Sequence, residues 1–106
     1  MADNNIQTST PKGSRDTQFR REEPPRYKVV LHNDDFTTMD FVVNLLQTVF
    51  HKGGIEAKEI MMTVHRTGKG TAGIYTLDIA RSKAEKGKRM AREEGFPLQI
   101  TCEPNN

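Results

Sequence analysis

The sequence predicts an α+β domain with the element order β-α-α-β-α-β, in which a small antiparallel three-stranded sheet packs on three helices. Three segments carry helical periodicity, and three short segments around them have the character of strands. The strands are short and the helices are not paired with parallel crossovers, which favours an α+β arrangement. The chain contains no internal repeat, and its length leaves room for one small domain.

Composition limits the class of protein before any motif is considered. The chain has 106 residues, of which 34% are hydrophobic and none is tryptophan, so its core should be thin. A net charge of +2 does not indicate a strong nucleic-acid binder, since such proteins neutralise many phosphates. The single cysteine, Cys102, cannot form an internal disulfide, which fits a reducing compartment. The polar N-terminus lacks the apolar stretch of a signal peptide, and we expect a cytoplasmic protein with no membrane span.

The chain divides into an extension and a domain. Residues 1–25 are rich in polar and charged side chains and contain almost no large apolar residues, which predicts a disordered N-terminal extension. Pro24 and Pro25 end this segment with a stiff, extended element. The domain is therefore expected over residues 26–106.

The first half of the domain begins with a strand over Tyr27–Leu31, where β-branched residues and an aromatic residue dominate. Turn formers follow, and Thr37 is then expected to cap a helix, with Asp40 in the glutamate position of a capping box. Gly53 and Gly54 are expected to end this helix. Its apolar residues recur at intervals of three and four positions and are Met39, Val42, Val43, Leu46, Val49 and Phe50.

A second helix is predicted from Glu56 to about Arg66. Its apolar face consists of Ala57, Ile60, Met61 and Val64. Gly68 is expected to end this helix, because glycine readily adopts the backbone conformation found at helix C-termini. The glycine-containing segment 70–75 is a candidate for the next strand.

A third helix is predicted from Thr76, as its cap, to about Glu94. Gly95 suits the position after the helix, and Pro97 prevents its continuation. Basic side chains lie toward the C-terminal end of this helix, where they interact favourably with the helix dipole. The segment 98–102 is then the last strand.

One cluster of polar residues stands out beside the first helix. Asn33, Asp34 and Asp35 place an amide and two carboxylates in a tight turn, and a local turn that caps the helix explains this pattern without any ligand. Adjacent carboxylates repel each other unless a positive group shares them, however. Acidic groups next to the apolar face that starts at Met39 suit a ligand with a cationic end and an apolar end. His65 belongs to this site only if it faces the turn, and it otherwise serves as a helix-terminal histidine.

Three motifs in this order resemble the ClpS family of protease adaptors. Residues 27–42 read Tyr-Lys-Val-Val-Leu-His-Asn-Asp-Asp-Phe-Thr-Thr-Met-Asp-Phe-Val, close to the family signature. Residues 61–70 read Met-Met-Thr-Val-His-Arg-Thr-Gly-Lys-Gly and resemble a second family stretch, and residues 95–98 read Gly-Phe-Pro-Leu, like its closing motif. Thr38 stands where the family usually has proline, and Asp40 stands where it usually has glutamate. The resemblance covers residues 27–102.

The resemblance implies a function and its site residues. ClpS-like proteins bind substrates whose first residue is Leu, Phe, Tyr or Trp, and deliver these N-degron substrates to the ClpA subunit of the ClpAP protease. Substrate α-amino and backbone groups would be bound by Asn33, Asp34, Asp35 and His65. The first side chain would enter a pocket formed by Leu31, Thr37, Met39, Val42, Met61, Val64 and Leu98, in which Met39 would reject β-branched residues. Asp78 and Lys83 would lie on the surface that docks on the N-terminal domain of ClpA.

The same resemblance implies an adaptor and not an enzyme. We expect no catalytic residue, no cofactor and no metal, and a monomer that binds neither nucleic acid nor membrane. Physical chemistry agrees with recognition of a free N-terminus, because an α-amino group is mostly protonated at neutral pH and offers three hydrogen-bond donors. Met39 and Met61 would accommodate varied side chains, although ordinary core packing explains them as well.

The residues alone also allow two other functions. A metal-dependent hydrolase could use Asp34, Asp35 and His65, although the chain has no His-x-x-x-His or Cys-x-x-Cys spacing. A nucleic-acid binder could use the basic residues of the third helix, which a solvated surface with interspersed glutamates also explains. These basic residues are Arg81, Lys83, Lys86, Lys88, Arg89 and Arg92.

Overall fold

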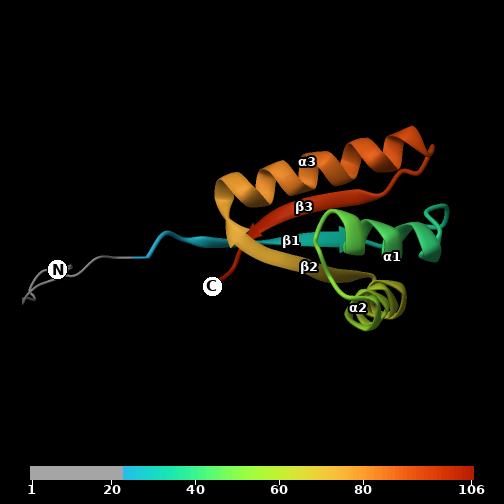
Figure 1. Ribbon diagram of the computed structural model, residues 1–106, viewed down its shortest axis with the longest axis horizontal. Coiled ribbons are helices and arrows are strands. Elements are labelled where there is room, and N and C mark those ends of the chain that lie inside the picture. The colour runs from blue at the N-terminus through green and yellow to red at the C-terminus, as the bar shows by residue number, and fades with distance from the viewer. Residues whose placement is uncertain (1–22) are drawn as a thin grey trace, which may run out of the picture.

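The computed structural model describes residues 23–106, so nearly all of the extension predicted over residues 1–25 lies outside the described residues. Three strands form one sheet with the order β2-β1-β3 (Figure 1). The central strand β1 (Arg26–His32) pairs antiparallel with both β2 (Lys69–Thr76) and β3 (Gln99–Pro104). The prediction of a small antiparallel sheet in an α+β domain, with the order β-α-α-β-α-β, is therefore confirmed.

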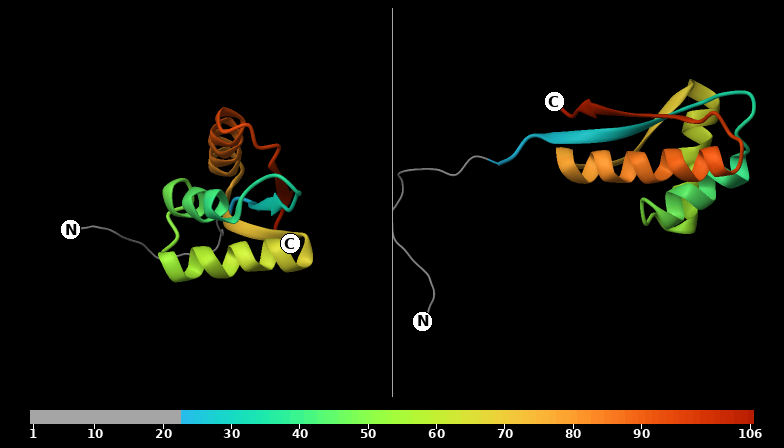
Figure 2. Two further views of the ribbon diagram at one scale, coloured as in Figure 1. Left: turned by 90° about the vertical axis from the view of Figure 1, so that its right-hand side faces the viewer. Right: turned by 90° about the horizontal axis from the view of Figure 1, so that it is seen from above.

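Three helices cover one face of the sheet (Figure 2). Helix α1 (Met39–Thr48) packs against α2 (Gly54–Thr67), and α2 lies along β2. Helix α3 (Leu77–Glu93) packs mainly on β3 and also contacts β2 and β1. Within residues 23–106, none of these helices combines the length and the apolar character that crossing a membrane requires.

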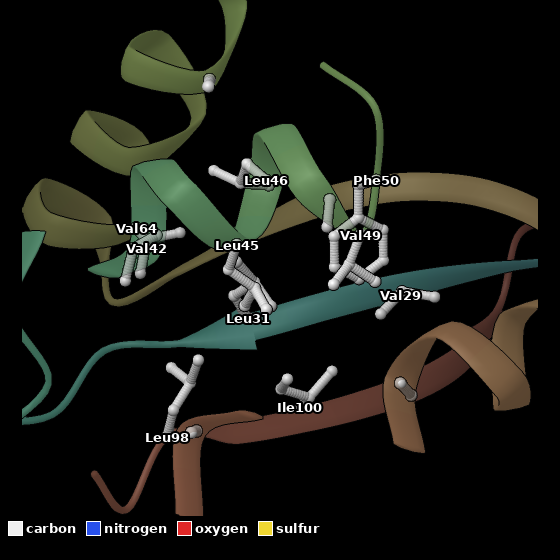
Figure 3. Packing of buried hydrophobic residues seen from close by; sticks show 14 of the residues in the cluster. Val29, Leu31, Val42, Leu45, Leu46, Val49, Phe50, Val64, Leu98 and Ile100 are labelled. Carbon is white, nitrogen blue, oxygen red and sulfur yellow. The ribbon is translucent and has the colours of Figure 1, made fainter. Parts of the chain in front are cut away.

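The core lies between the helices and the inner face of the sheet (Figure 3). Strand β1 sends Val29 and Leu31 into it, and both side chains are fully buried. Leu45 of α1 meets Ile100 of β3 close to α3, where a side chain at Gly87 would lie only 2.9 Å from Ile100 Cδ1. No polar or charged residue of the described chain is buried, so apolar packing forms the whole interior.

The N-terminus of α1 differs from the prediction by one residue. Thr38, not Thr37, is the N-cap, and its Oγ1 accepts a hydrogen bond of 3.1 Å from the Phe41 amide. The amide and the hydroxyl of Thr37 instead donate to the Asp34 carboxylate, and these two hydrogen bonds hold Thr37 in the turn before the helix. Two adjacent threonines are equally good caps by sequence, and the turn before the helix decides between them.

The C-terminus of α1 also differs from the prediction. The helix ends at Thr48, and Val49 and Phe50 remain buried after the chain has left the helix. Gly53 and Gly54 do not end α1, because Gly53 is the N-cap of α2 and Gly54 its first residue. The reversal occurs instead at His51, whose φ of 57° is the one positive value at a non-glycine residue among the described residues.

The remaining boundaries lie within about two residues of the prediction. Gly68 ends α2 in the left-handed conformation with a φ of 97°, and Gly95 follows α3 with a φ of 78°, as their positions indicated. Thr76 occupies the N-cap position of α3 as predicted, but its side chain makes no capping hydrogen bond. The register between β1 and β2 shifts between Val29 and Val30, a β-bulge that the sequence did not indicate.

Candidate functional site

A pocket with a volume of about 260 Å³ opens where the chain passes from β1 into α1. The turn after β1, the first turns of α1 and the C-terminal half of α2 supply its walls. The structure thus brings together residues that are more than 30 positions apart in the sequence. The lining residues are Asn33, Asp34, Asp35, Thr37, Met39, Val42, Met61, Val64 and His65, all of which were predicted as site residues.

Asp34 holds the turn in shape. Its Oδ1 accepts hydrogen bonds from the amides of Phe36 at 2.8 Å and Thr37 at 2.7 Å, and its Oδ2 accepts one from Thr37 Oγ1 at 2.8 Å. Burial tends to raise the pKa of Asp34, but these hydrogen bonds, together with the positive charge of Arg92, lower it below its usual value. The local-turn explanation therefore applies to Asp34, and its predicted contact with a bound peptide stays a prediction.

The polar end of the pocket joins two elements through one backbone hydrogen bond. The Asn33 amide donates to the Gly68 carbonyl oxygen at 2.9 Å, which fixes the turn against the end of α2. His65 lies three residues before Gly68 and shares the pocket with Asn33 and Asp35. All three side chains are exposed and make no hydrogen bond to another side chain in the described part of the chain, so they are available to a ligand.

The other end of the pocket is apolar. Val42 and Val64 belong to the core cluster and are only 6% and 3% exposed, and Figure 3 shows them at one end of that cluster. Met61 is half-buried beside them. Met39 is 43% exposed at the start of α1, so its flexible side chain lies at the mouth of the pocket. A cavity with acceptors at one end and apolar walls at the other fits a small amphipathic group.

The structure does not bring two predicted residues into the pocket lining. Leu31 is fully buried near the C-terminal end of β1, and Leu98 is 1% exposed before β3 (Figure 3). Both pack in the hydrophobic core. They support the apolar wall from behind, because Val42 and Val64 belong to the same core cluster.

Asp78 and Lys83 lie on α3 and do not line this pocket. Asp78 is exposed in the first turn of the helix. Lys83 is half-buried, and its Nζ donates a 2.8 Å hydrogen bond to the carbonyl oxygen of Val49 and lies 5.4 Å from the Tyr75 ring centroid. Lys83 thus has a structural contact, between α3 and the end of α1, that the sequence did not reveal.

The side chains of the described residues do not form a metal site. Across residues 23–106, no group of three or more His, Cys, Asp or Glu side chains is arranged to hold a metal ion. In the candidate pocket, Asp34 uses both carboxylate oxygens to accept hydrogen bonds from the turn itself.

Comparison with known proteins identifies the family. A family model described as ATP-dependent Clp protease adaptor protein ClpS matches residues 22–101. The ClpS adapter protein of Acetivibrio thermocellus is 53% identical over 90 residues, which cover 85% of this chain and 91% of that protein. The ClpS adapter protein of Ralstonia pickettii is 47% identical over 102 residues, which cover 92% of this chain and 94% of that protein.

A solved structure agrees with these relatives. The structure of Agrobacterium tumefaciens ClpS2 bound to L-phenylalaninamide is 40% identical, with a TM-score of 0.75, and the match covers 78% of this chain and all of that one. The fold, the motifs and the relatives all lead to the same family. The chain therefore belongs to the ClpS family of ATP-dependent Clp protease adaptor proteins, and it is an adaptor and not a catalytic enzyme.

Proposed function

We propose that the pocket binds the N-terminus of proteins whose first residue is large and hydrophobic, namely Leu, Phe, Tyr or Trp, and that the adaptor delivers these substrates to the ClpA ATPase of ClpAP for degradation. One observation carries the proposal. A single cavity joins the exposed polar side chains of Asn33, Asp35 and His65 to the apolar side chains of Met39 and Val64. A free N-terminal residue has two parts that match the two ends of this cavity: a cationic amine that donates hydrogen bonds and an apolar side chain.

The polar end distinguishes a free amine from an ordinary peptide group. An α-amino group has a pKa of about 7.7–8.0, so at neutral pH it is mostly a cation with three donors. Asn33 and Asp35 offer oxygen acceptors, and His65 offers a ring nitrogen. A residue inside a chain has one amide donor and no charge, and would leave acceptors unpaired at about 1–3 kcal/mol for each group.

The apolar end selects the first side chain. Burying a Leu or Phe side chain contributes about 1.5–3 kcal/mol, and both pocket methionines can adjust to different shapes. L-phenylalaninamide, found with the Agrobacterium tumefaciens relative, has a free α-amino group and a phenylalanine side chain. That ligand supports the same type of recognition in this chain.

Delivery requires a surface separate from the pocket. Asp78, exposed at the start of α3, is proposed to contact the N-terminal domain of ClpA together with Lys83, and neither residue lines the pocket. The adaptor is proposed to act as a cytoplasmic monomer. Residues 26–106 are proposed to suffice for substrate binding, and residues 1–25 to assist the transfer to the protease.

The test is a binding panel of short peptides that differ only in the first residue. Peptides that begin with Leu or Phe should bind, whereas an Ala-first peptide and N-acetylated Leu-first peptide should not. Asp35→Ala and His65→Ala should each weaken binding roughly tenfold or more, as loss of a charge-assisted hydrogen bond implies, and should leave the fold intact. Equal affinity for the free and acetylated peptides would refute the proposal.

A matched variant separates binding from delivery. Asp78→Ala also removes one exposed carboxylate, but far from the pocket lining, so it should bind the Leu-first peptide normally and slow degradation of an N-degron protein by ClpAP. Deletion of residues 1–25 should likewise preserve peptide affinity and slow degradation. Degradation at the wild-type rate would show that the altered group has no part in delivery.

A further inference from the structure

His32, the last residue of β1, is tied to β3 by a hydrogen-bonded chain of three side chains. Its Nε2 lies 2.8 Å from Oγ1 of Thr101, and the Thr101 hydroxyl donates to Oε2 of Glu103 at 3.2 Å. All three side chains are half-buried. Leu31 and Ile100 point into the core, so alternation along the strands puts the three side chains on the face of the sheet opposite the helices (Figure 2). None of the roles described above uses them.

The chemistry of the three groups fixes the direction of these hydrogen bonds. A carboxylate only accepts hydrogen bonds, so the Thr101 hydroxyl gives its proton to Glu103. The Thr101 oxygen then accepts from His32, whose Nε2 carries the proton. The imidazole is therefore held as a donor in one orientation. Side chains as well as the backbone ladder join β1 to β3 at this point.

We propose that His32 is a positioning residue for Asn33, the next residue in the chain, and that it holds the Asn33 side chain where it can accept a hydrogen bond from the substrate amine. The inference rests on the proposed function, since it concerns how the polar end of the same pocket is kept in shape. His32 does not itself line the pocket, whereas Asn33 does. It acts through the peptide bond that the two residues share.

The place of His32 in the sheet explains why an anchor matters there. Its pairs with Lys69 of β2 and Gln99 of β3 are the last pairs of both ladders, and the chain then leaves the sheet. The ends of strands open more readily than their centres. A side-chain anchor at the last pair therefore restrains the point from which the pocket turn starts.

Asn33 lies between two anchors. On one side, its own amide donates to the carbonyl oxygen of Gly68 at the end of α2, at 2.9 Å. On the other side, the residue before it is fixed to Thr101 of β3. The Asn33 side chain is exposed and makes no hydrogen bond to another side chain within residues 23–106, so its place depends on the backbone that carries it. Loosening either anchor would let this backbone move, and less of the protein would then be ready to bind.

The experiment uses the full chain as wild type and in four variants. Thr101→Val removes the hydroxyl and keeps the β-branched shape, so it breaks both hydrogen bonds. Thr71→Val is the matched control, because exposed Thr71 pairs with Val30 from β2 as Thr101 pairs with it from β3. His32→Gln places an amide donor near the position of Nε2, whereas His32→Asn is too short to reach it.

Three quantities are measured for each form. Fluorescence anisotropy gives the affinities for a Phe-first and a Leu-first peptide, hydrogen exchange gives the protection of the Asn33 amide, and urea unfolding gives the stability. Both peptides present the same amine, so the ratio of their affinities reports on the apolar end alone. A role in positioning Asn33 lowers both affinities together and leaves this ratio unchanged, whereas a purely structural role lowers stability alone.

Thr101→Val and His32→Asn should each weaken binding of both peptides by about two- to fivefold and speed exchange of the Asn33 amide by a similar factor, as loss of one neutral hydrogen bond implies. His32→Gln should recover most of the affinity, and Thr71→Val should change neither readout. Unchanged affinity in Thr101→Val would overturn the proposal. An equal loss in Thr71→Val, or equal losses in His32→Gln and His32→Asn, would also overturn it.

Failure of the proposed function gives a different pattern. If the wild-type protein binds no N-terminal peptide, that function is wrong, but exchange of the Asn33 amide still decides whether His32 and Thr101 hold the start of the turn. If peptides bind and Thr101→Val changes neither affinity nor exchange, the positioning role fails while the function stands.

Discussion

Replacing Gly70 with alanine would place a methyl group in the contact between β2 and α2. The new Cβ would lie 2.9 Å from Cγ2 of Val64 and 3.5 Å from the carbonyl oxygen of Ile60. Carbon atoms in contact are ordinarily about 3.5–4.0 Å apart, so the Val64 side chain must retreat by about 0.5 Å or more. Since Val64 lines the candidate pocket, we expect this retreat to narrow it.

The size of the effect follows from two opposing contributions. Forcing an extra carbon into a packed interior costs about 1–3 kcal/mol, and replacing glycine by alanine returns about 0.4–1 kcal/mol by restricting the unfolded chain. Gly70→Ala should therefore lower the free energy of unfolding by about 1.3 kcal/mol, the difference between the middle values of these two ranges. In the pocket, losing room for one CH₂ group costs about 0.8 kcal/mol, roughly a fourfold loss for the largest side chains.

Two measurements test this reasoning. Urea unfolding gives the loss of stability, and peptides that begin with Leu, Phe or Trp give the change in preference, which should favour Leu. Gly54→Ala is the matched control, because the nearest atom to its new Cβ is Gln47 Nε2 at an ordinary 3.6 Å. Gly54 lies in α2, so this control should stabilise the protein by up to about 1 kcal/mol. Wild-type stability and unchanged preference in Gly70→Ala would refute the argument.

Further predictions concern the turn, the helix ends and the pocket mouth. Because the pKa of Asp34 is lowered on folding, its stabilising contribution is complete above the unfolded value of about 3.9 and is lost as pH falls through the lower folded value. Urea midpoints of wild type and Asp34→Asn should therefore differ at neutral pH and converge in strong acid. Gly68→Ala and Gly95→Ala should each lower the free energy of unfolding by about 1–2 kcal/mol, because both positions have positive φ. Only Gly68→Ala should weaken peptide binding, since strain there would shift the carbonyl oxygen that accepts a hydrogen bond from Asn33 of the turn. His51→Gly should raise the unfolding free energy by about 0.5 kcal/mol, as relief at a φ of 57° slightly exceeds the added chain entropy. Met39→Ala should admit Ile-first and Val-first peptides, and loss of Leu binding without such a gain would show that Met39 only packs.

Element order could be predicted because periodicity and glycine positions depend on local physics. The apolar residues of α1 recur every three or four positions, and Gly68 and Gly95 occupy left-handed positions that other residues rarely adopt. The ends of α1 could not be predicted in the same way. Thr37 and Thr38 are equivalent caps by sequence, and the choice depends on Asp34, which binds the Thr37 hydroxyl.

The pocket could be predicted from the family motifs more fully than from periodicity. Periodicity assigns Val42 and Leu46 to one apolar face, yet Val42 lines a pocket and Leu46 lies in the closed core. Both residues are apolar and buried, and the sequence does not show that the space beside Val42 stays open as a pocket while the space around Leu46 is filled by the core. The same ambiguity explains Leu31 and Leu98, which were predicted at the pocket and lie in the core behind it.

The two adjacent carboxylates show how one turn can combine a structural role with the binding role proposed above. Both carboxylate oxygens of Asp34 accept hydrogen bonds from Phe36 or Thr37 of the same turn, and these bonds lower the pKa of Asp34 because they favour its ionised form. Asp35 stays exposed and lines the same pocket. Because Asp34 already holds the backbone, Asp35 needs no partner among residues 23–106, and the cationic amine that we propose as the ligand would relieve the repulsion between the two carboxylates. The hydrogen bonds of Asp34 therefore hold the turn without a ligand, and the carboxylate of Asp35 stays available for the amine that we propose to bind there.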